Sequence, residues 1–139
     1  MKNIFKFFLI IIPFVSFYSI ADVHVIVHPS NDAIIKKLDV KKIFLGKTTN
    51  FKNGKLAIPI NLSDEIDIRT IFNMKILSRT NSQVARAWSK IEFTNTGTPP
   101  SEKTATEVIE LIANNPNMIG YIDSQYITTK NVKVVLTIK

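Results

Sequence analysis

The sequence predicts a single α/β domain in which a mixed or mostly parallel sheet is flanked by helices. Its 139 residues match the size of one domain, roughly 100–200 residues. Short runs rich in β-branched residues alternate with capped, amphipathic helical segments, and strands separated by helices are typical of layered α/β domains. The chain contains no Cys, which excludes disulfides, thiolate zinc sites and a cysteine nucleophile.

The N-terminal segment, residues 1–21, has the features of a secretory signal peptide. Lys2 and Lys6 supply positive charge before an apolar run at Phe7–Val15. The small residues Ser19 and Ala21 then mark a cleavage site after Ala21. That run is shorter than the ~18–20 apolar residues that span a membrane, so an uncleaved anchor is the less favoured alternative. We therefore expect a periplasmic or secreted domain at residues 22–139.

The first part of this domain is expected to contain two strands, two short helices and one longer helix. β-branched residues indicate the strands, and polar residues that can cap a helix stand before each helical segment. In chain order, the expected elements are a strand at Val23–Val27, helices at Ala33–Leu38 and Val40–Leu45, a strand at Leu56–Ile60 and a helix at Glu65–Leu77.

Two capping boxes predict the helices of the second part, Thr80 with Gln83 and Thr104 with Glu107. The helix that begins after Thr80 is expected to run through Lys90. The remaining expected elements are a loop at Thr94–Ser101 and strands at Met118–Ile122 and Val132–Ile138. Such an alternation of strands and helices places ligands at the carboxyl ends of the strands.

The sequence lacks the residue patterns that most catalytic mechanisms require. His24 and His28 lie on one expected strand, about 13 Å apart, which is too far to share a metal ion. Motifs for serine nucleophiles and phosphate-binding glycine loops are absent. We therefore expect no enzyme activity, no cofactor and no metal. The net charge of +7 comes from scattered basic residues without an RNA-binding motif, which argues against nucleic acid and suits a general attraction for small anions.

Arg69 is the most unusual residue of the expected helices. It lies near a helix start, where the helix dipole disfavours a cation, and on the same face as Ile68 and Phe72. A partly buried guanidinium beside backbone N–H groups suits an anion. The alternative is an ion pair with Glu65, or a side chain that passes over the apolar face into solvent.

Two loops offer further polar groups for a ligand site. Ser30 and Asn31 follow the first strand, where they either supply donors to a ligand or only cap the next helix. Thr96, Gly97 and Thr98 lie in a hydroxyl-rich loop. This loop either closes over a polar ligand or serves as an ordinary connection.

Several segments share their order and residues with a known group of proteins. The most specific are Ile43–Lys47, which reads I-F-L-G-K, and Ile119–Asp123, which reads I-G-Y-I-D. The others are Val25–Asn31, Asn53-Gly54, Arg69 with Phe72, Trp88 with Phe93-Thr94, and Gly97–Pro100. Together they resemble the small exported proteins related to phosphate-binding components of ABC transporters. The resemblance implies a type 2 periplasmic-binding-protein-like fold, in a reduced form with a single lobe.

The chain departs from that family at the phosphate loop. In the full-length phosphate binders that it resembles, an Arg followed by Asp-Gly-Ser-Gly-Thr stands at a helix N-terminus. Here the stretch Asn61–Arg69 contains three carboxylates instead, where a phosphate needs donors. Only Ser63 and Arg69 remain as donors in that stretch.

Two functions are consistent with these observations. The first is an exported solute-binding-like module for phosphate or a similar small oxyanion, in transport or sensing, with Ser30, Asn31, Ser63 and Arg69 converging on a concave site. Its partners would be the oxyanion, a membrane transporter or sensor protein, and a second copy in a homodimer, since one lobe covers only part of an anion. The second is a protein-interaction or sensory-input domain that kept the fold and lost the ligand, for which an exposed apolar patch is expected.

Overall fold

The computed structural model describes residues 10–16, 22–63, 67–127 and 131–139. Residues 10–16 are exposed without regular secondary structure, and the rest of the expected signal peptide lies outside the described residues, so its assignment stays a prediction. Among the described residues, no helix has the length and hydropathy to cross a membrane. The buried apolar side chains of this part all fall between Val23 and Val132, so residues 22–139 contain its whole core.

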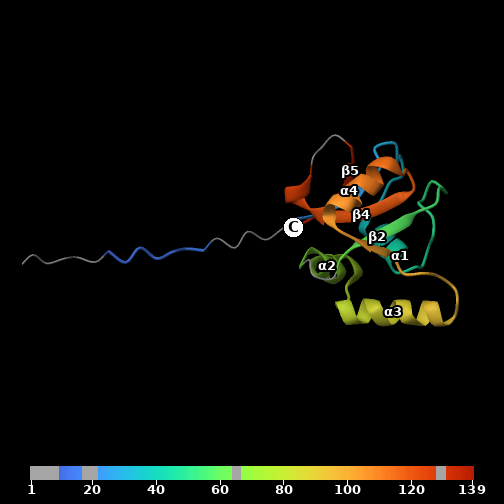
Figure 1. The fold of residues 1–139 in the computed structure, drawn as a ribbon, viewed down its shortest axis with the longest axis horizontal. Coiled ribbons are helices and arrows are strands. Elements are labelled where there is room, and N and C mark those ends of the chain that lie inside the picture. Colours follow the sequence, from blue (N-terminus) through green and yellow to red (C-terminus); the bar gives the residue numbers. More distant parts are fainter. Residues whose placement is uncertain (1–9, 17–21, 64–66, 128–130) are drawn as a thin grey trace, which may run out of the picture.

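A five-stranded mixed sheet forms the centre of the fold (Figure 1). The strands are β1 at Val23–Val27, β2 at Ile58–Leu62, β3 at Ser101–Lys103, β4 at Met118–Asp123 and β5 at Lys133–Ile138. Their order across the sheet is β3-β2-β4-β1-β5. β1 pairs antiparallel with both β4 and β5, whereas β2 pairs parallel with both β3 and β4. The expected α/β fold with a mixed sheet is confirmed, and the sheet is not mostly parallel.

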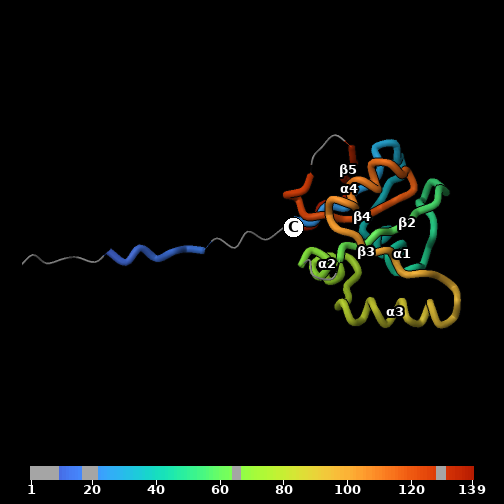
Figure 2. The backbone as a smooth tube through the Cα atoms, viewed as in Figure 1, coloured from blue at the N-terminus to red at the C-terminus, as the bar shows by residue number. Residues whose placement is uncertain are grey.

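Helices cover both faces of this sheet, as the smooth backbone trace also shows (Figure 2). They are α1 at Lys37–Phe44, α2 at Asp67–Phe72 with a π-helical extension at Asn73–Leu77, α3 at Asn81–Phe93 and α4 at Ala105–Asn114. Gly120 of β4 faces α4, because a Cβ there would meet Val108 at 2.8 Å. Tyr121, the next residue, points to the other face and stacks on Phe72 of α2 with ring centroids 3.7 Å apart.

The outermost helix, α3, is attached to the domain through Trp88. The indole Nε1 donates a hydrogen bond to the carbonyl oxygen of Phe44, at the end of α1, at 3.1 Å. Gly46, with φ of +68°, follows α1, and a Cβ there would lie 2.8 Å from the Trp88 ring. The close approach and the positive φ both favour glycine at this position. At the other end of α3, the Asn81 amide donates to Thr70 of α2 at 2.9 Å.

The helix expected at Ala33–Leu38 is wrong, since residues 31–36 have no regular secondary structure. The side chain of Asn31 accepts from the Ala33 N–H at 2.9 Å, so it forms a local turn instead of capping a helix. The helix begins only at Lys37, where Asp39 accepts from the Lys36 N–H at 2.8 Å. The expected second short helix therefore starts earlier than predicted and ends at Phe44.

The other differences concern boundaries and one strand. The second strand lies two residues further along, because Leu56 forms only an isolated bridge with Asn50. The helix expected at Glu65–Leu77 is described from Asp67, and its last turn widens to π-helix. β3 falls at the end of the expected loop and has only exposed residues. The helices expected after Thr80 and Thr104, and the strands at β1, β4 and β5, are confirmed.

Candidate functional site

The carboxyl ends of the parallel strands form the edge where α/β folds bind ligands. β2, β3 and β4 all point toward this edge, and α2 follows β2 there. Tyr121 helps to fix the end of β2, since its hydroxyl donates to the buried Asn61 side chain at 2.9 Å and accepts from the Leu62 N–H at 3.4 Å. The edge is therefore held by buried hydrogen bonds, which makes it a rigid support for polar side chains.

Arg69 is held at this edge by the turn of α2. Its neighbours Ile68 and Phe72 are buried, so the helix face that carries Arg69 lies against the sheet. Its guanidinium Nη1 donates to the Leu62 carbonyl oxygen at 3.2 Å and forms an ion pair with the Glu102 carboxylate of β3. The Arg69 side chain is 15% exposed and that of Glu102 is 45% exposed. The Glu102 carboxylate, which belongs to the chain itself, therefore already contacts the guanidinium as an anion would.

The ion pair with Glu102 bears on the alternatives considered for Arg69, namely an anion site, an ion pair within the helix, or a side chain that passes into solvent. The guanidinium is neither isolated nor directed over the apolar face into solvent, because Glu102 and Leu62 hold it. Glu65, the partner considered from helix spacing, lies outside the described residues. Glu102 could not be paired with Arg69 from the sequence, since 33 positions separate them and β3 carries no strand pattern.

Ser63 is the one other candidate residue that lies at the same edge. It directly follows β2, is half-buried, and its backbone N–H donates to the Lys103 carbonyl oxygen at 3.2 Å. The structure therefore brings Ser63 and Arg69 to one end of the sheet, where Arg69 contacts the carbonyl oxygen of Leu62, the residue before Ser63.

Ser30 and Asn31 do not join them, which corrects the expected convergence. They follow Val27, which pairs with Ile119 near the start of β4, whereas β2 ends on the side where β4 also ends. Because β1 runs against β4, the two pairs of residues lie at opposite edges. The levels of Val27, which precedes Ser30, and of Ser63 are already separated by about 13 Å along the strands. The Ser30 hydroxyl instead contacts His28 Nδ1 at 2.7 Å.

The loop with Thr96, Gly97 and Thr98 lies at a third place. It follows the end of α3 that packs against Gly46, about 18 Å along the helix from its α2-facing end. The Thr96 hydroxyl bonds to the Ile91 carbonyl oxygen at 3.3 Å and to the Thr94 hydroxyl at 2.9 Å. These contacts complete the end of α3, which agrees with the alternative that the loop is an ordinary connection.

Among the described residues, no group of three His, Asp or Glu side chains could hold a metal ion. His24 contacts the Thr137 hydroxyl at 2.9 Å, on the neighbouring strand. Asp32, which lies at the opposite edge, has a lowered pKa. The amide of Asn53 donates to it at 2.8 Å, and this bond, together with the charge of Lys55, lowers the pKa of Asp32.

The fold matches part of the fold of solved ABC-transporter substrate-binding proteins. Solved structures that resemble it include the following three. One is named a phosphate ABC transporter substrate-binding protein from Clostridium perfringens, and its structure holds phosphate. It is 20% identical to this chain, with a TM-score of 0.61, and the match covers 83% of this chain and 44% of that protein. A phosphate transport receptor from Vibrio cholerae is 13% identical, with a TM-score of 0.63, over 83% and 45%. PstS from Borrelia burgdorferi is 18% identical, with a TM-score of 0.57, over 76% and 42%.

The chain therefore has the fold of one part of a phosphate-binding protein of this kind, and it spans less than half the length of each of these structures. This confirms, for the fold, the likeness first seen in the sequence. No family model matches the chain, and no curated protein matches it.

Proposed function

We propose that the chain is an exported solute-binding-like module that binds phosphate or a similar small oxyanion at Arg69 and Ser63. The contact between the Arg69 guanidinium and the Glu102 carboxylate carries this proposal, because it places oxygen atoms with negative charge on a mostly buried donor at the ligand-binding edge of the fold. The phosphate held by the Clostridium perfringens structure supports the choice of ligand.

In this proposal, Glu102 competes with the ligand. Its side chain is more exposed than that of Arg69, so it can turn toward solvent at little cost when an anion enters. Ser63, which directly follows the Leu62 that Arg69 contacts, then supplies a hydroxyl as a second donor. Because one lobe leaves much of the anion hydrated, the affinity is expected to be modest unless a second copy pairs across the site.

The proposal also covers export of the chain, its membrane partner and its oligomeric state. Residues 1–21 would direct export to the periplasm or the medium, and the bound anion would be passed to, or sensed by, a membrane transporter or sensor protein. Homodimerisation would complete the half-covered site. The names of two similar structures support the transporter as a partner. Export rests on the pattern of residues 1–21, and homodimerisation rests on the half-covered site.

The test is a thermal-shift titration of residues 22–139 with phosphate, with sulfate and chloride at equal ionic strength as controls. Binding to the folded state stabilises it by about 2.7 kcal/mol at 100 times Kd. Glu102→Gln should tighten phosphate binding because it removes the competing charge, and Arg69→Gln should abolish it. Arg86→Gln, on the exposed face of α3, is the matched control.

Three results would refute the assignment. The first is the absence of a phosphate-selective thermal shift in both the parent and the Glu102→Gln variant. The second is an equal loss of phosphate binding in the Arg69→Gln and Arg86→Gln variants. The third is phosphate binding that persists in the Arg69→Gln variant. Circular dichroism of each variant separates lost binding from lost folding.

A further inference from the structure

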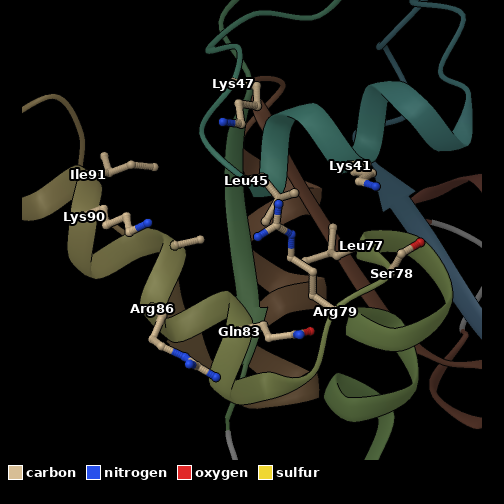
Figure 3. Close-up of a pocket in the computed structure, with 11 residues that line it drawn as sticks. Lys41, Leu45, Lys47, Leu77, Ser78, Arg79, Gln83, Arg86, Lys90 and Ile91 are labelled. Carbon is tan, nitrogen blue, oxygen red and sulfur yellow. The ribbon is translucent and has the colours of Figure 1, made fainter.

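A second feature lies away from the oxyanion site, in a groove between α1 and α3 (Figure 3). It has a volume of about 690 Å3. The polar lining is formed mostly by cations from four segments of the chain: Lys41, Lys47, Arg79, Arg86 and Lys90. Neither Asp nor Glu lines it. Within the described part of the chain, none of these five side chains forms an ion pair.

The floor of the groove is apolar. Leu45 and Leu77 are 4% and 1% exposed, and Ile91 is half-buried beside them. Figure 3 shows Lys41 of α1 and the residues just after this helix on one side and the side chains of α3 on the other, with Arg79 between them. The groove thus combines buried aliphatic side chains with a rim of positive charge. It is therefore complementary to a ligand that carries both apolar groups and negative charge.

The positions on α3 make the groove elongated. Gln83, Arg86, Ala87, Lys90 and Ile91 follow the spacing of one helix face, over about 12 Å. That length corresponds to about four residues of an extended peptide. A phosphate ion would contact only a small part of it.

We propose that this groove docks an acidic segment of another protein, one that carries apolar side chains between its carboxylates. Rows of cations around an apolar floor match such a segment in charge and in polarity. The proposal goes beyond the oxyanion site, since it uses α1 and α3, whereas Arg69 and Ser63 lie at the edge of the sheet.

Other occupants fit less well. A flat anionic membrane surface would not reach apolar residues on the floor of a groove. Single-stranded nucleic acid uses aromatic side chains for stacking, and none lines this groove. A second copy of the chain would bring another net charge of +7, which opposes approach through the basic face.

The test uses a fluorescent peptide of about six residues that alternates Glu and Leu, long enough to cover the groove. Fluorescence anisotropy measures its binding to residues 22–139. The peptide should bind in a salt-dependent manner, and a matched Glu–Ser peptide should bind more weakly. The double variant Arg86→Gln with Lys90→Gln should weaken binding roughly tenfold.

The matched control is Lys37→Gln with Lys42→Gln, which removes the same charge from exposed positions of α1 outside the groove. Gln preserves helix propensity at all four positions, so folding should be retained. An equal loss in both double variants would overturn the proposal, as would equal binding of the Glu–Ser peptide or no binding at all.

Three further outcomes would replace the proposed occupant: tighter binding of phosphatidylserine vesicles, tighter binding of single-stranded DNA, or self-association of the chain that the groove variant abolishes. Inorganic phosphate that displaces the peptide better than chloride at equal ionic strength would also refute it. Failure of the oxyanion site is recognised separately, because Arg69→Gln should leave peptide binding unchanged.

Discussion

Gly46→Ala is expected to destabilise the domain by detaching α3 from α1. Two effects add. The residue has φ of +68°, and a side chain in the left-handed region costs roughly 1–2 kcal/mol. The new Cβ would also lie 2.8 Å from the ring of Trp88 and 3.2 Å from Ile91. Trp88 is buried and hydrogen-bonded to Phe44, so the ring cannot move away freely, and such overpacking costs about 1–3 kcal/mol. The free energy of unfolding should therefore fall by about 2–5 kcal/mol.

Gly54→Ala is the matched control. Gly54 has φ of +86°, but a Cβ there would meet nothing within 4 Å. This variant should lose only the backbone contribution, about 1–2 kcal/mol. The effect of alanine on the unfolded chain is the same in both variants and cancels in the comparison. The difference between them isolates the contact with Trp88.

Urea denaturation followed by fluorescence and circular dichroism measures both losses. Trp88 is the single Trp of the chain, so its emission reports on this contact directly. Gly46→Ala should also shift the emission of the folded state, because the indole moves toward solvent. Equal losses of stability in the two variants, with unchanged emission, would refute the packing of α3 described above.

Three further predictions follow from individual hydrogen bonds. Tyr121→Phe should lower stability by about 1–3 kcal/mol, because it leaves the buried Asn61 side chain without its donor; urea denaturation measures this, and no change would contradict it. Thr104→Ala should lower stability by about 0.5–2 kcal/mol through loss of the α4 cap, with a serine variant as control. Asn53→Ala should raise the pKa of Asp32 toward the ordinary value of an Asp, as measured by NMR titration. Since the folded-state pKa is lowered, the stability from this bond is present above the ordinary pKa and is lost as the pH falls through the folded-state pKa.

Local signals predicted most of the elements. The capping boxes at Thr80 and Thr104 place both helix starts correctly, because each signal depends on residues three positions apart. β3 could not be found this way. Its residues are exposed and charged, and they form a strand only because β2 offers a free edge for parallel pairing. Such pairing depends on the fold and not on the sequence of the strand itself.

The expected convergence of Ser30 and Asn31 on Arg69 failed for a related reason. Loops that follow strands meet at one edge only when those strands are parallel. β1 runs against β4 and β2 runs along it, and strand direction is a property of the connections. Residue patterns in the two strands do not differ in a way that reveals it.

The two proposed sites differ in how far the sequence could indicate them. Arg69 conflicts with its local setting, as a cation at a helix start and on an apolar face, and such conflicts mark residues whose partners lie elsewhere in the fold. One partner, Leu62 at the end of β2, lies seven residues earlier, and the other, Glu102 of β3, lies 33 positions away. Lys41, Arg86 and Lys90, by contrast, are ordinary surface residues of their own helices. They form one basic groove only because Trp88 fixes α3 against the end of α1, which a reading of one segment at a time does not reveal. Gly46→Ala therefore tests more than stability, since displacement of α3 should also weaken binding of the acidic peptide while leaving the oxyanion site at Arg69 intact.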